Sequence, residues 1–402
     1  MSTAAPLLWT FASHAKEIQQ HLQHAAASPG PGLLSLSRAE AAALTGLGLL
    51  DNADAVAKAA AALRKATGRA VVITADGAAE PGYADTPHAS GWLSVTATGK
   101  PAHTNASQVF TDAAAQALAK GFVAMEAIVL ATMARTDALC HHTVDGPLEP
   151  RANFAQDITN LPAFSLPTPS AVSGFAALSD ADLGLYAVVD SAAWVARVVS
   201  AGVRTVQLRI KDAEGAEHRD FVRGQIRESI RAATAAGAQL FINDHWQLAI
   251  EEGAYGVHLG QEDLHIADLA AIARAGVRLG ISTHAYWEVC RAWALRPSYI
   301  ACGPIHPTQA KAMPWIPQGK DNLAYWCSLL PLPVVGIAGM DVARTEEAAR
   351  CGAAGVAVIS AITAAPSPED AVRELQQALQ RGRSGPPDAA PLQARPTLAQ
   401  AN

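Results

Sequence analysis

Short apolar runs alternate with longer alanine-rich segments through the second half of the chain. Each run is followed by a segment with helical character, such as Ala192–Ala201. Near-continuous apolar strands that alternate with helices are typical of a parallel sheet covered on both faces. The pattern predicts an α/β fold, a (β/α)₈ TIM barrel. A doubly wound open sheet is the alternative, but its GxGxxG fingerprint is absent after the first run. The runs are Leu185–Asp190, Thr205–Ile210, Gln239–Asp244, Gly256–Gly260, Arg278–Thr283, Ser298–Gly303, Pro333–Gly339 and Gly355–Ser360.

Changes in composition divide the chain further. Five prolines lie between residues 145 and 180 without a helical period, which is typical of a linker or an extended arm. The end of the chain is rich in Pro and Ala, which is typical of a disordered tail. We expect an α/β module over 1–145, a Pro-rich linker over 146–181, the barrel over 182–382 and the tail over 383–402.

Composition and charge exclude several classes of protein. Half of the 402 residues are hydrophobic and 16% are charged, which excludes a disordered chain. The most apolar stretch, residues 122–134, contains Glu126 and is shorter than the ~20 residues of a membrane span. The net charge of −6 comes without a basic block, so we expect no nucleic-acid partner. Five scattered cysteines and the lack of a signal-peptide pattern predict a cytoplasmic protein.

Polar residues follow the predicted strands at the end where a barrel carries its chemistry. Strand alternation places Gln207, Arg209 and Lys211 on one side of the second run. Two cations and an amide suit a phosphate or pyrophosphate. The alternative is that the cations form ion pairs with acidic residues of neighbouring strands.

Two acidic residues end the next two runs. Asp244 follows Asn243, and Asp263 lies beyond the fourth run, so the carboxylates can converge at adjacent strand ends. Carboxylates with nearby amide oxygens suit Mg²⁺. The alternative is helix capping, since each Asp precedes a helical segment. For His258, within the fourth run, a packing role in the core is favoured.

The remaining strand ends offer hydroxyls, a cation and glycines. Ser282 ends the fifth run, Thr308 and Lys311 lie in the loop after the sixth, and Gly339 and Ser360 end the last two. Phosphate binding after strands 7 and 8 recurs in this fold and uses backbone N–H groups. Together the strand ends predict an enzyme that brings two phosphorylated substrates together.

These residues resemble the thiamine-phosphate synthase family, also called thiamine-phosphate pyrophosphorylase. The resemblance covers about Leu183–Leu379 in consistent order and spacing. It implies a transferase of thiamine biosynthesis that joins 4-amino-2-methyl-5-(diphosphooxymethyl)pyrimidine to 4-methyl-5-(2-phosphooxyethyl)thiazole and releases pyrophosphate. The matching motifs are QLRIK at 207–211, ND at 243–244, HLGQED at 258–263, GIS at 280–282, GPIHPTQAK at 303–311, GIAGM at 336–340 and VIS at 358–360.

The resemblance also implies residue roles and a dissociative mechanism, in which pyrophosphate leaves before the thiazole nitrogen attacks. Asp244 and Asp263 would bind Mg²⁺. The family's Pro-Thr-x-Thr-Lys loop has Ala310 in place of the second Thr, so we expect weaker thiazole phosphate binding with activity retained. The pyrimidine pyrophosphate would be held by Gln207, Leu208, Arg209, Ile210, Lys211, Asn243, Ser282 and Lys311, of which Arg209, Lys211, Ser282 and Lys311 are the expected catalytic residues. The thiazole phosphate would be held by the loop Thr308, Gln309, Ala310 and by Gly339, Ile359 and Ser360.

The first block resembles a truncated hydroxymethylpyrimidine-phosphate kinase of the ribokinase-like class. The resemblance rests on the Leu36–Gly46 stretch, the Val71–Gly77 strand and the His103–Gln108 segment. The glycines of the kinase anion hole are missing, and Ser107 stands near the place of the catalytic Asp or Cys. We therefore expect a degenerate module without kinase activity.

Two other functions compete with the synthase assignment. A thiazole tautomerase-like barrel enzyme would have no pyrimidine pyrophosphate to bind, which the Gln207, Arg209 and Lys211 set argues against. A thiamine-phosphate-binding regulator without turnover is favoured only by Ala310. The small-molecule substrates are the expected partners, and a homo-oligomer is an option that the sequence does not decide.

Overall fold

The structure is a computed structural model. It describes residues 8–10, 16–20, 32–74, 82–95, 103, 105–143, 146–165, 172, 174–211, 215–307 and 314–400. The chain forms two compact units. The first unit comprises Met1–Pro167, Ala285–Ala294 and Pro396–Asn402, and the second comprises Thr168–His284 and Leu295–Arg395.

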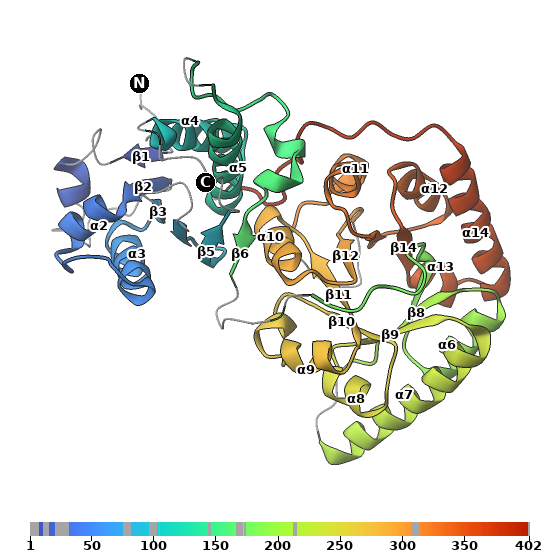
Figure 1. The fold of residues 1–402 in the computed structure, drawn as a ribbon. Coiled ribbons are helices and arrows are strands. Elements are labelled where there is room, and N and C mark those ends of the chain that lie inside the picture. Colours follow the sequence, from blue (N-terminus) through green and yellow to red (C-terminus); the bar gives the residue numbers. More distant parts are fainter. Residues whose placement is uncertain are drawn as a thin grey trace. The chain divides into compact units, whose positions relative to one another are not determined.

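The second unit contains a closed barrel of eight strands (Figure 1). All neighbouring strands pair in parallel, and β14 closes the barrel against β7. Each strand coincides with one of the eight predicted apolar runs, so the predicted (β/α)₈ barrel is confirmed. The strands are β7 (Gly184–Val189), β8 (Thr205–Leu208), β9 (Gln239–Asn243), β10 (Gly256–Leu259), β11 (Arg278–Thr283), β12 (Tyr299–Cys302), β13 (Val334–Ile337) and β14 (Gly355–Val358).

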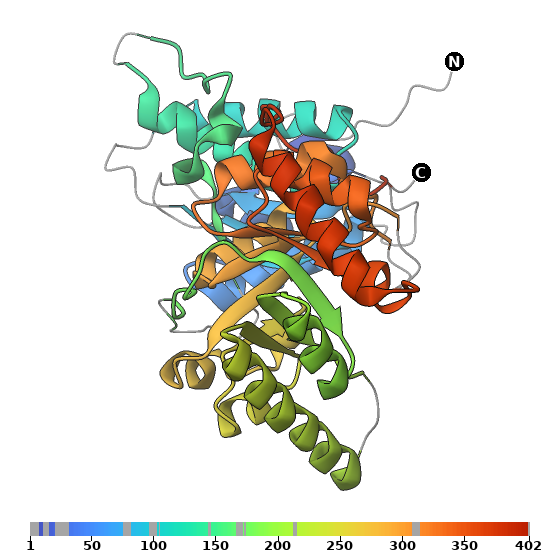
Figure 2. The same ribbon diagram turned by 90° about the vertical axis from the view of Figure 1, so that its right-hand side faces the viewer.

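Helices cover the outside of the barrel, and Figure 2 shows the long α7 and α14 from the side. α10 (Tyr286–Leu295) follows β11 in the chain, and its residues up to Ala294 group with the first unit. Side-chain caps begin three of the helices, from Ser191 at α6, Asp268 at α9 and Asp341 at α12. The other helices of this unit are α6 (Ala192–Ser200), α7 (Ala216–Ala236), α8 (Trp246–Glu251), η3 (Asp263–His265), α9 (Leu269–Arg274), α11 (Gly319–Leu329), α12 (Val342–Arg350), α13 (Ser360–Thr363) and α14 (Pro368–Ser384).

Aromatic rings fill the barrel interior. Tyr186, Phe241 and Tyr299 are buried in one cluster, with Phe241 and Tyr299 packed edge to face at 5.0 Å between ring centroids. Gly280 faces this cluster, because a Cβ built there would lie 2.1 Å from the Tyr299 ring. Residue 280 must therefore lack a side chain for the tyrosine to occupy the interior.

The first unit contains a six-stranded mixed sheet in the order β1 to β6. β1, β2 and β3 pair in parallel, and β3 to β6 pair antiparallel. Ser37 and Glu40 form a reciprocal capping box at the start of α2. The elements are β1 (Leu8–Thr10), β2 (Leu33–Ser37), α2 (Arg38–Thr45), α3 (Ala53–Thr67), β3 (Ala70–Thr74), β4 (Gly82–Asp85), β5 (Ser90–Ser94), α4 (Ala106–Ala119), α5 (Ala124–His141), η1 (Phe154–Gln156), η2 (Ile158–Asn160) and β6 (Ala163–Phe164).

Two segments differ from their expected structure. The expected linker contains η1, η2 and β6, and Arg151 binds the buried Asp137 of α5 through its backbone N–H at 2.8 Å and its Nε at 2.9 Å. The expected tail buries Thr397 and Leu398, and Thr397 donates to the Glu126 carboxylate at 2.7 Å. Specific hydrogen bonds order both segments despite their Pro-rich composition. Among the described residues, no helix is long and apolar enough to cross a membrane.

Candidate active site

The predicted anion-binding residues lie where β8 ends. Gln207 is buried, and its Nε2 donates to the Tyr186 hydroxyl at 3.2 Å, so its side chain faces the barrel interior. Arg209 is half-buried and Lys211 is exposed. Among the described residues, neither cation lies within ion-pair distance of a carboxylate. The described residues thus show no direct ion pair to Arg209 or Lys211, although the charge of Lys211 acts on Asp244.

Two carboxyl groups meet beside these cations. Asp244 follows β9, with its side chain accepting a hydrogen bond from Asn243 Nδ2 at 2.5 Å. Asp263 accepts from the backbone N–H of Gly260 at 3.0 Å. Burial, reinforced by the adjacent Asp263, raises the pKa of Asp244 to about 6, and Lys211 opposes this rise. The carboxyl groups of Asp244 and Asp263 therefore lie next to each other.

Helix capping does not account for these two residues. His245 precedes α8 and Glu262 precedes η3, and neither helix start has a side-chain cap. Asp244 adopts a left-handed backbone with φ of 60°, which is uncommon for a residue with a side chain. An uncommon backbone conformation of this kind is typical of functional sites, so it favours a binding role for Asp244 over helix capping.

The donor set fits a hard cation such as Mg²⁺. Carboxylate oxygens from Asp244 and Asp263 and the amide of Asn243 are oxygen ligands of the kind that Mg²⁺ prefers. Burial and the neighbouring Asp263 both raise the pKa of Asp244, and a bound cation would offset both effects. A cluster of Asp137, His141 and Asp157 in the first unit also has metal-ligand spacing. There, however, the Arg151 guanidinium already binds both carboxylates.

Ser282 ends β11 and meets His258 of β10. His258 Nε2 lies 2.8 Å from Ser282 Oγ, and its Nδ1 lies 2.7 Å from the Tyr299 hydroxyl. Burial, with a smaller effect of Arg209, lowers the pKa of His258 to about 4, so the ring is neutral at physiological pH. His258 is thus a core histidine with a hydrogen-bond partner at each ring nitrogen, as expected. One of these partners, Ser282, is a predicted substrate-binding residue.

The predicted thiazole phosphate residues are described in part. Thr308, Gln309, Ala310 and Lys311 lie outside the described residues. Gly339 has φ of 69°, and a Cβ there would lie 2.7 Å from the Pro307 carbonyl oxygen, so the backbone runs close to the β12 loop. Ile359 and Ser360 are exposed at the start of the short α13, which follows β14.

Sequence reasoning missed the two tyrosines behind these residues. Tyr186 and Tyr299 hydroxyls lie 2.8 Å apart inside the barrel, although they stand 113 residues apart in the chain. A polar residue within an apolar run was the signal available, but alternation alone does not identify its partner across a barrel.

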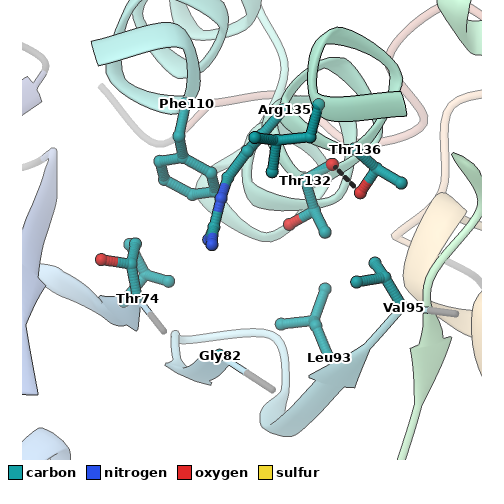
Figure 3. A pocket seen from close by; sticks show the side chains of 10 residues that line it. Thr74, Gly82, Leu93, Val95, Phe110, Thr132, Arg135 and Thr136 are labelled. Atoms are coloured by element: carbon teal, nitrogen blue, oxygen red, sulfur yellow. Dashed lines mark hydrogen bonds between the residues drawn. The ribbon is translucent and has the colours of Figure 1, made fainter. Parts of the chain in front are cut away.

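The expected kinase-like site in the first unit does not form a phosphate cradle in the described residues. Asn105 begins α4 with an ordinary negative φ and no side-chain cap, and Ser107 is exposed. Thr104 lies outside the described residues. A separate small pocket lies between the sheet and α4 and α5, where Arg135 extends past Phe110 (Figure 3). Its walls are mainly apolar, with hydroxyls from Thr74, Thr132 and Thr136.

Part of the chain, within the barrel, matches a known protein family. The family described as thiamine monophosphate synthase matches residues 185–362. A thiamine-phosphate synthase of Serratia proteamaculans is 52% identical over 203 residues, which cover 49% of this chain and 92% of that protein. The enzyme of Photorhabdus laumondii is 50% identical over 194 residues, or 48% of this chain and 88% of that protein. A solved thiamine phosphate pyrophosphorylase from Pyrococcus furiosus is 25% identical, with a TM-score of 0.45, and covers 50% of this chain and 97% of that one.

Proposed function

This chain belongs to the thiamine-phosphate synthase family, and on that premise we propose how its barrel performs the synthase reaction. The protein is a transferase of thiamine biosynthesis. Its substrates are the pyrimidine pyrophosphate and the thiazole phosphate named above. The C–O bond between the pyrimidine methylene and pyrophosphate breaks, a C–N bond to the thiazole nitrogen forms, and thiamine phosphate and pyrophosphate are released.

The pyrimidine pyrophosphate binds between β8 and β11. Arg209 and Lys211 neutralise the pyrophosphate, and both lack a carboxylate partner within the described residues. Gln207, Leu208, Ile210 and Asn243 line the same end of the barrel. Ser282 and Lys311 complete the contacts to the leaving group. The observation that carries this proposal is the pair of acidic side chains, Asp244 and Asp263, with the charge of Lys211 close enough to act on Asp244.

Asp244 and Asp263 would hold Mg²⁺, with Asn243 orienting Asp244. Bound there, Mg²⁺ would add positive charge beside the pyrophosphate leaving group. The protein needs no nucleophile of its own, because the thiazole nitrogen attacks the pyrimidine methyl cation that pyrophosphate leaves behind. Its residues act by binding, by orientation and by stabilising the leaving group.

The thiazole phosphate binds at the ends of β12, β13 and β14, at the same mouth of the barrel. Gly339 brings a backbone without a side chain close to the β12 loop, and Ser360 adds a hydroxyl at the start of α13. Thr308, Gln309 and Ala310 belong to the same subsite by the family resemblance, together with Ile359. Ala310 removes one hydroxyl contact, so the Michaelis constant for the thiazole phosphate is the parameter expected to rise.

We also propose that the first unit has no kinase activity, because Ser107 is exposed and the glycines of an anion cradle are absent. A cytoplasmic location and a homo-oligomeric state remain proposals. The five cysteines are free thiols, which is consistent with a reducing compartment.

A steady-state assay tests the synthase proposal. The purified full-length chain is supplied with both substrates and Mg²⁺, and thiamine phosphate is measured by conversion to a fluorescent thiochrome. We expect turnover that disappears with a chelator and returns when Mg²⁺ is restored. The same preparation with ATP and the pyrimidine monophosphate should form no pyrophosphate ester. Absence of thiamine phosphate under all these conditions would overturn the synthase assignment.

A further inference from the structure

A continuous row of buried hydrogen bonds crosses the barrel interior. Gln207 Nε2 donates to the Tyr186 hydroxyl at 3.2 Å, and the Tyr186 and Tyr299 hydroxyls lie 2.8 Å apart. The Tyr299 hydroxyl lies 2.7 Å from His258 Nδ1, and His258 Nε2 lies 2.8 Å from Ser282 Oγ. The two ends of the row, Gln207 and Ser282, are both predicted to touch the pyrimidine substrate.

The direction of these hydrogen bonds follows from counting protons. The Gln207 Nε2 group can only donate, so the Tyr186 oxygen accepts. Among the described residues, the one acceptor left for the Tyr186 proton is the Tyr299 oxygen. Tyr299 must then donate its own proton to His258 Nδ1. The imidazole is consequently protonated on Nε2 and donates to Ser282 Oγ.

The reverse direction leaves a buried group unsatisfied. If Tyr299 donated to Tyr186, the Tyr186 hydroxyl proton would lack an acceptor in a side chain that is 1% exposed. His258 would also accept the Ser282 proton and withdraw it from the substrate. With the Gln207 amide nitrogen facing Tyr186, as in this structure, only the forward direction satisfies every donor in the row.

We propose that Tyr186, Tyr299 and His258 form a one-way hydrogen-bond relay that turns the Ser282 hydroxyl proton toward the bound pyrimidine substrate. The Ser282 oxygen accepts from His258, so its own proton is left for the ligand, where an anionic leaving group needs a donor. The three relay residues are positioning residues, since they act through Ser282. This inference rests on the proposed function, because the ligand is the substrate of the synthase reaction.

The fold holds the relay in place. Gly280 of β11 pairs in register with Tyr299 of β12, and the Tyr299 ring lies directly against Gly280. Phe241 also packs edge to face against the Tyr299 ring. The ring therefore has little freedom to swing away from His258, and its hydroxyl is fixed between two partners.

The tautomer of His258 gives a direct test of the relay direction. We label histidine with ¹⁵N in the full-length chain and assign His258 by comparison with His258→Asn. We expect the signature of a neutral ring protonated on Nε2, and in Tyr299→Phe a shift toward a mixture of tautomers. A ring protonated on Nδ1 in the unaltered protein would overturn the relay direction, whatever the catalytic activity.

Kinetics test whether the relay acts through Ser282. Tyr299→Phe removes one hydroxyl and keeps the ring, and Tyr255→Phe is the matched control. The Tyr255 ring also packs against Phe241, but its hydroxyl bonds Ser179 and Gln239 outside the relay. We expect Tyr299→Phe to lower kcat by about tenfold, the kinetic equivalent of one lost hydrogen bond, and Tyr255→Phe to leave kcat within about twofold.

A double variant completes the experiment. In a Ser282→Ala background, Tyr299→Phe should have no further effect on kcat, because the relay ends at the missing hydroxyl. Equal effects of the two tyrosine variants, or additive effects with Ser282→Ala, would overturn the relay. If the thermal midpoint of Tyr299→Phe is lower than that of Tyr255→Phe, the experiment is repeated with Tyr186→Phe, which interrupts the same relay. Absence of turnover in the unaltered protein would instead refute the proposed function and leave the tautomer test standing.

Discussion

The two units are both α/β, but they differ in what their strand ends carry. In the barrel, polar side chains follow the strands at one mouth, where parallel pairing brings them together, as at Asp244 and Asp263. In the first unit half of the sheet is antiparallel, so its strand ends point in opposite directions. The comparison shows why eight short parallel strands can form a reaction site while a six-stranded mixed sheet need not.

The buried charges differ in the same way. Asp137 of the first unit is enclosed, and burial alone would raise its pKa, but hydrogen bonds from Arg151 and Asn160 outweigh burial and keep the pKa low. Asp244 of the barrel has no such cation in contact, and its pKa is raised. A buried carboxylate that is fully paired is costly to unpair, whereas one with a raised pKa is typical of a binding site.

The largest effect on turnover should follow from removing the charge of Asp244. Asp244→Asn keeps the shape of the side chain and should lower kcat by about 100- to 1000-fold, since it removes a ligand for the charge that stabilises the leaving group. Steady-state assays at saturating Mg²⁺ measure this. Asp268→Asn is the control, because Asp268 is an exposed carboxylate that only caps α9. Unchanged turnover in Asp244→Asn would refute the metal role.

The same variant should stabilise the metal-free protein. The pKa of Asp244 is raised in the folded state, so its ionised form opposes folding, and this cost grows as the pH rises through about 6. We expect Asp244→Asn to raise the thermal midpoint at pH 8 in the presence of a chelator and to change it little at pH 4. Equal thermal midpoints of the unaltered protein and Asp244→Asn at pH 8 would contradict the unfavourable burial of the Asp244 charge beside Asp263.

The second prediction removes the satisfied charge pair. Arg151→Ala leaves Asp137 buried without its cation and should destabilise the first unit by about 3 kcal/mol. Hydrogen exchange should accelerate along α5 and remain unchanged in β7–β14. The control is Arg197→Ala, which breaks the exposed pair with Glu369 and should cost at most about 1 kcal/mol. If Arg151→Ala also lowered synthase turnover, the division of roles between the units would be wrong.

The third prediction concerns the buried Glu126, to which the C-terminal segment binds. Burial raises the pKa of Glu126 to about 7, although hydrogen bonds from Thr397 oppose this rise. Because the folded-state pKa lies above the unfolded value, the associated stability is present at low pH and lost as the pH rises through about 7. Between pH 6 and pH 8, the unaltered protein should lose about 1 kcal/mol relative to Glu126→Gln, measured by thermal unfolding.

A control variant shows whether the pH effect comes from the burial of Glu126 or only from the loss of one negative charge. Glu149→Gln removes an exposed carboxylate and should follow the pH profile of the unaltered protein. Parallel profiles for the unaltered protein and Glu126→Gln would mean that Glu126 does not titrate in this range. Thr397→Val should then also leave the profile unchanged.

The sequence was sufficient for the barrel but not for its interior connections. The apolar runs predicted all eight strands because parallel strands buried on both faces need little else, and the strand ends predicted the Asp244–Asp263 pair because neighbouring ends must converge. The Tyr186–Tyr299 contact depends on where the barrel closes, which no local pattern encodes. Likewise, proline content indicated a linker at 146–181, but one tertiary pair, Arg151 with Asp137, orders part of it.

The smallest effect should come from a helix on the outside of the barrel. Gly224 lies within α7, and a Cβ there meets no atom within 4 Å. Gly224→Ala should stabilise the barrel by about 0.5–1 kcal/mol, because alanine loses less backbone entropy than glycine when a helix forms. Gly237 ends the same helix with φ of 64°, so Gly237→Ala should destabilise by a similar amount. Thermal unfolding at constant pH measures both, and turnover should stay constant. A change in kcat from Gly224→Ala would mean that the outer helices influence the strand ends, and that the barrel's chemistry is less local than its geometry indicates.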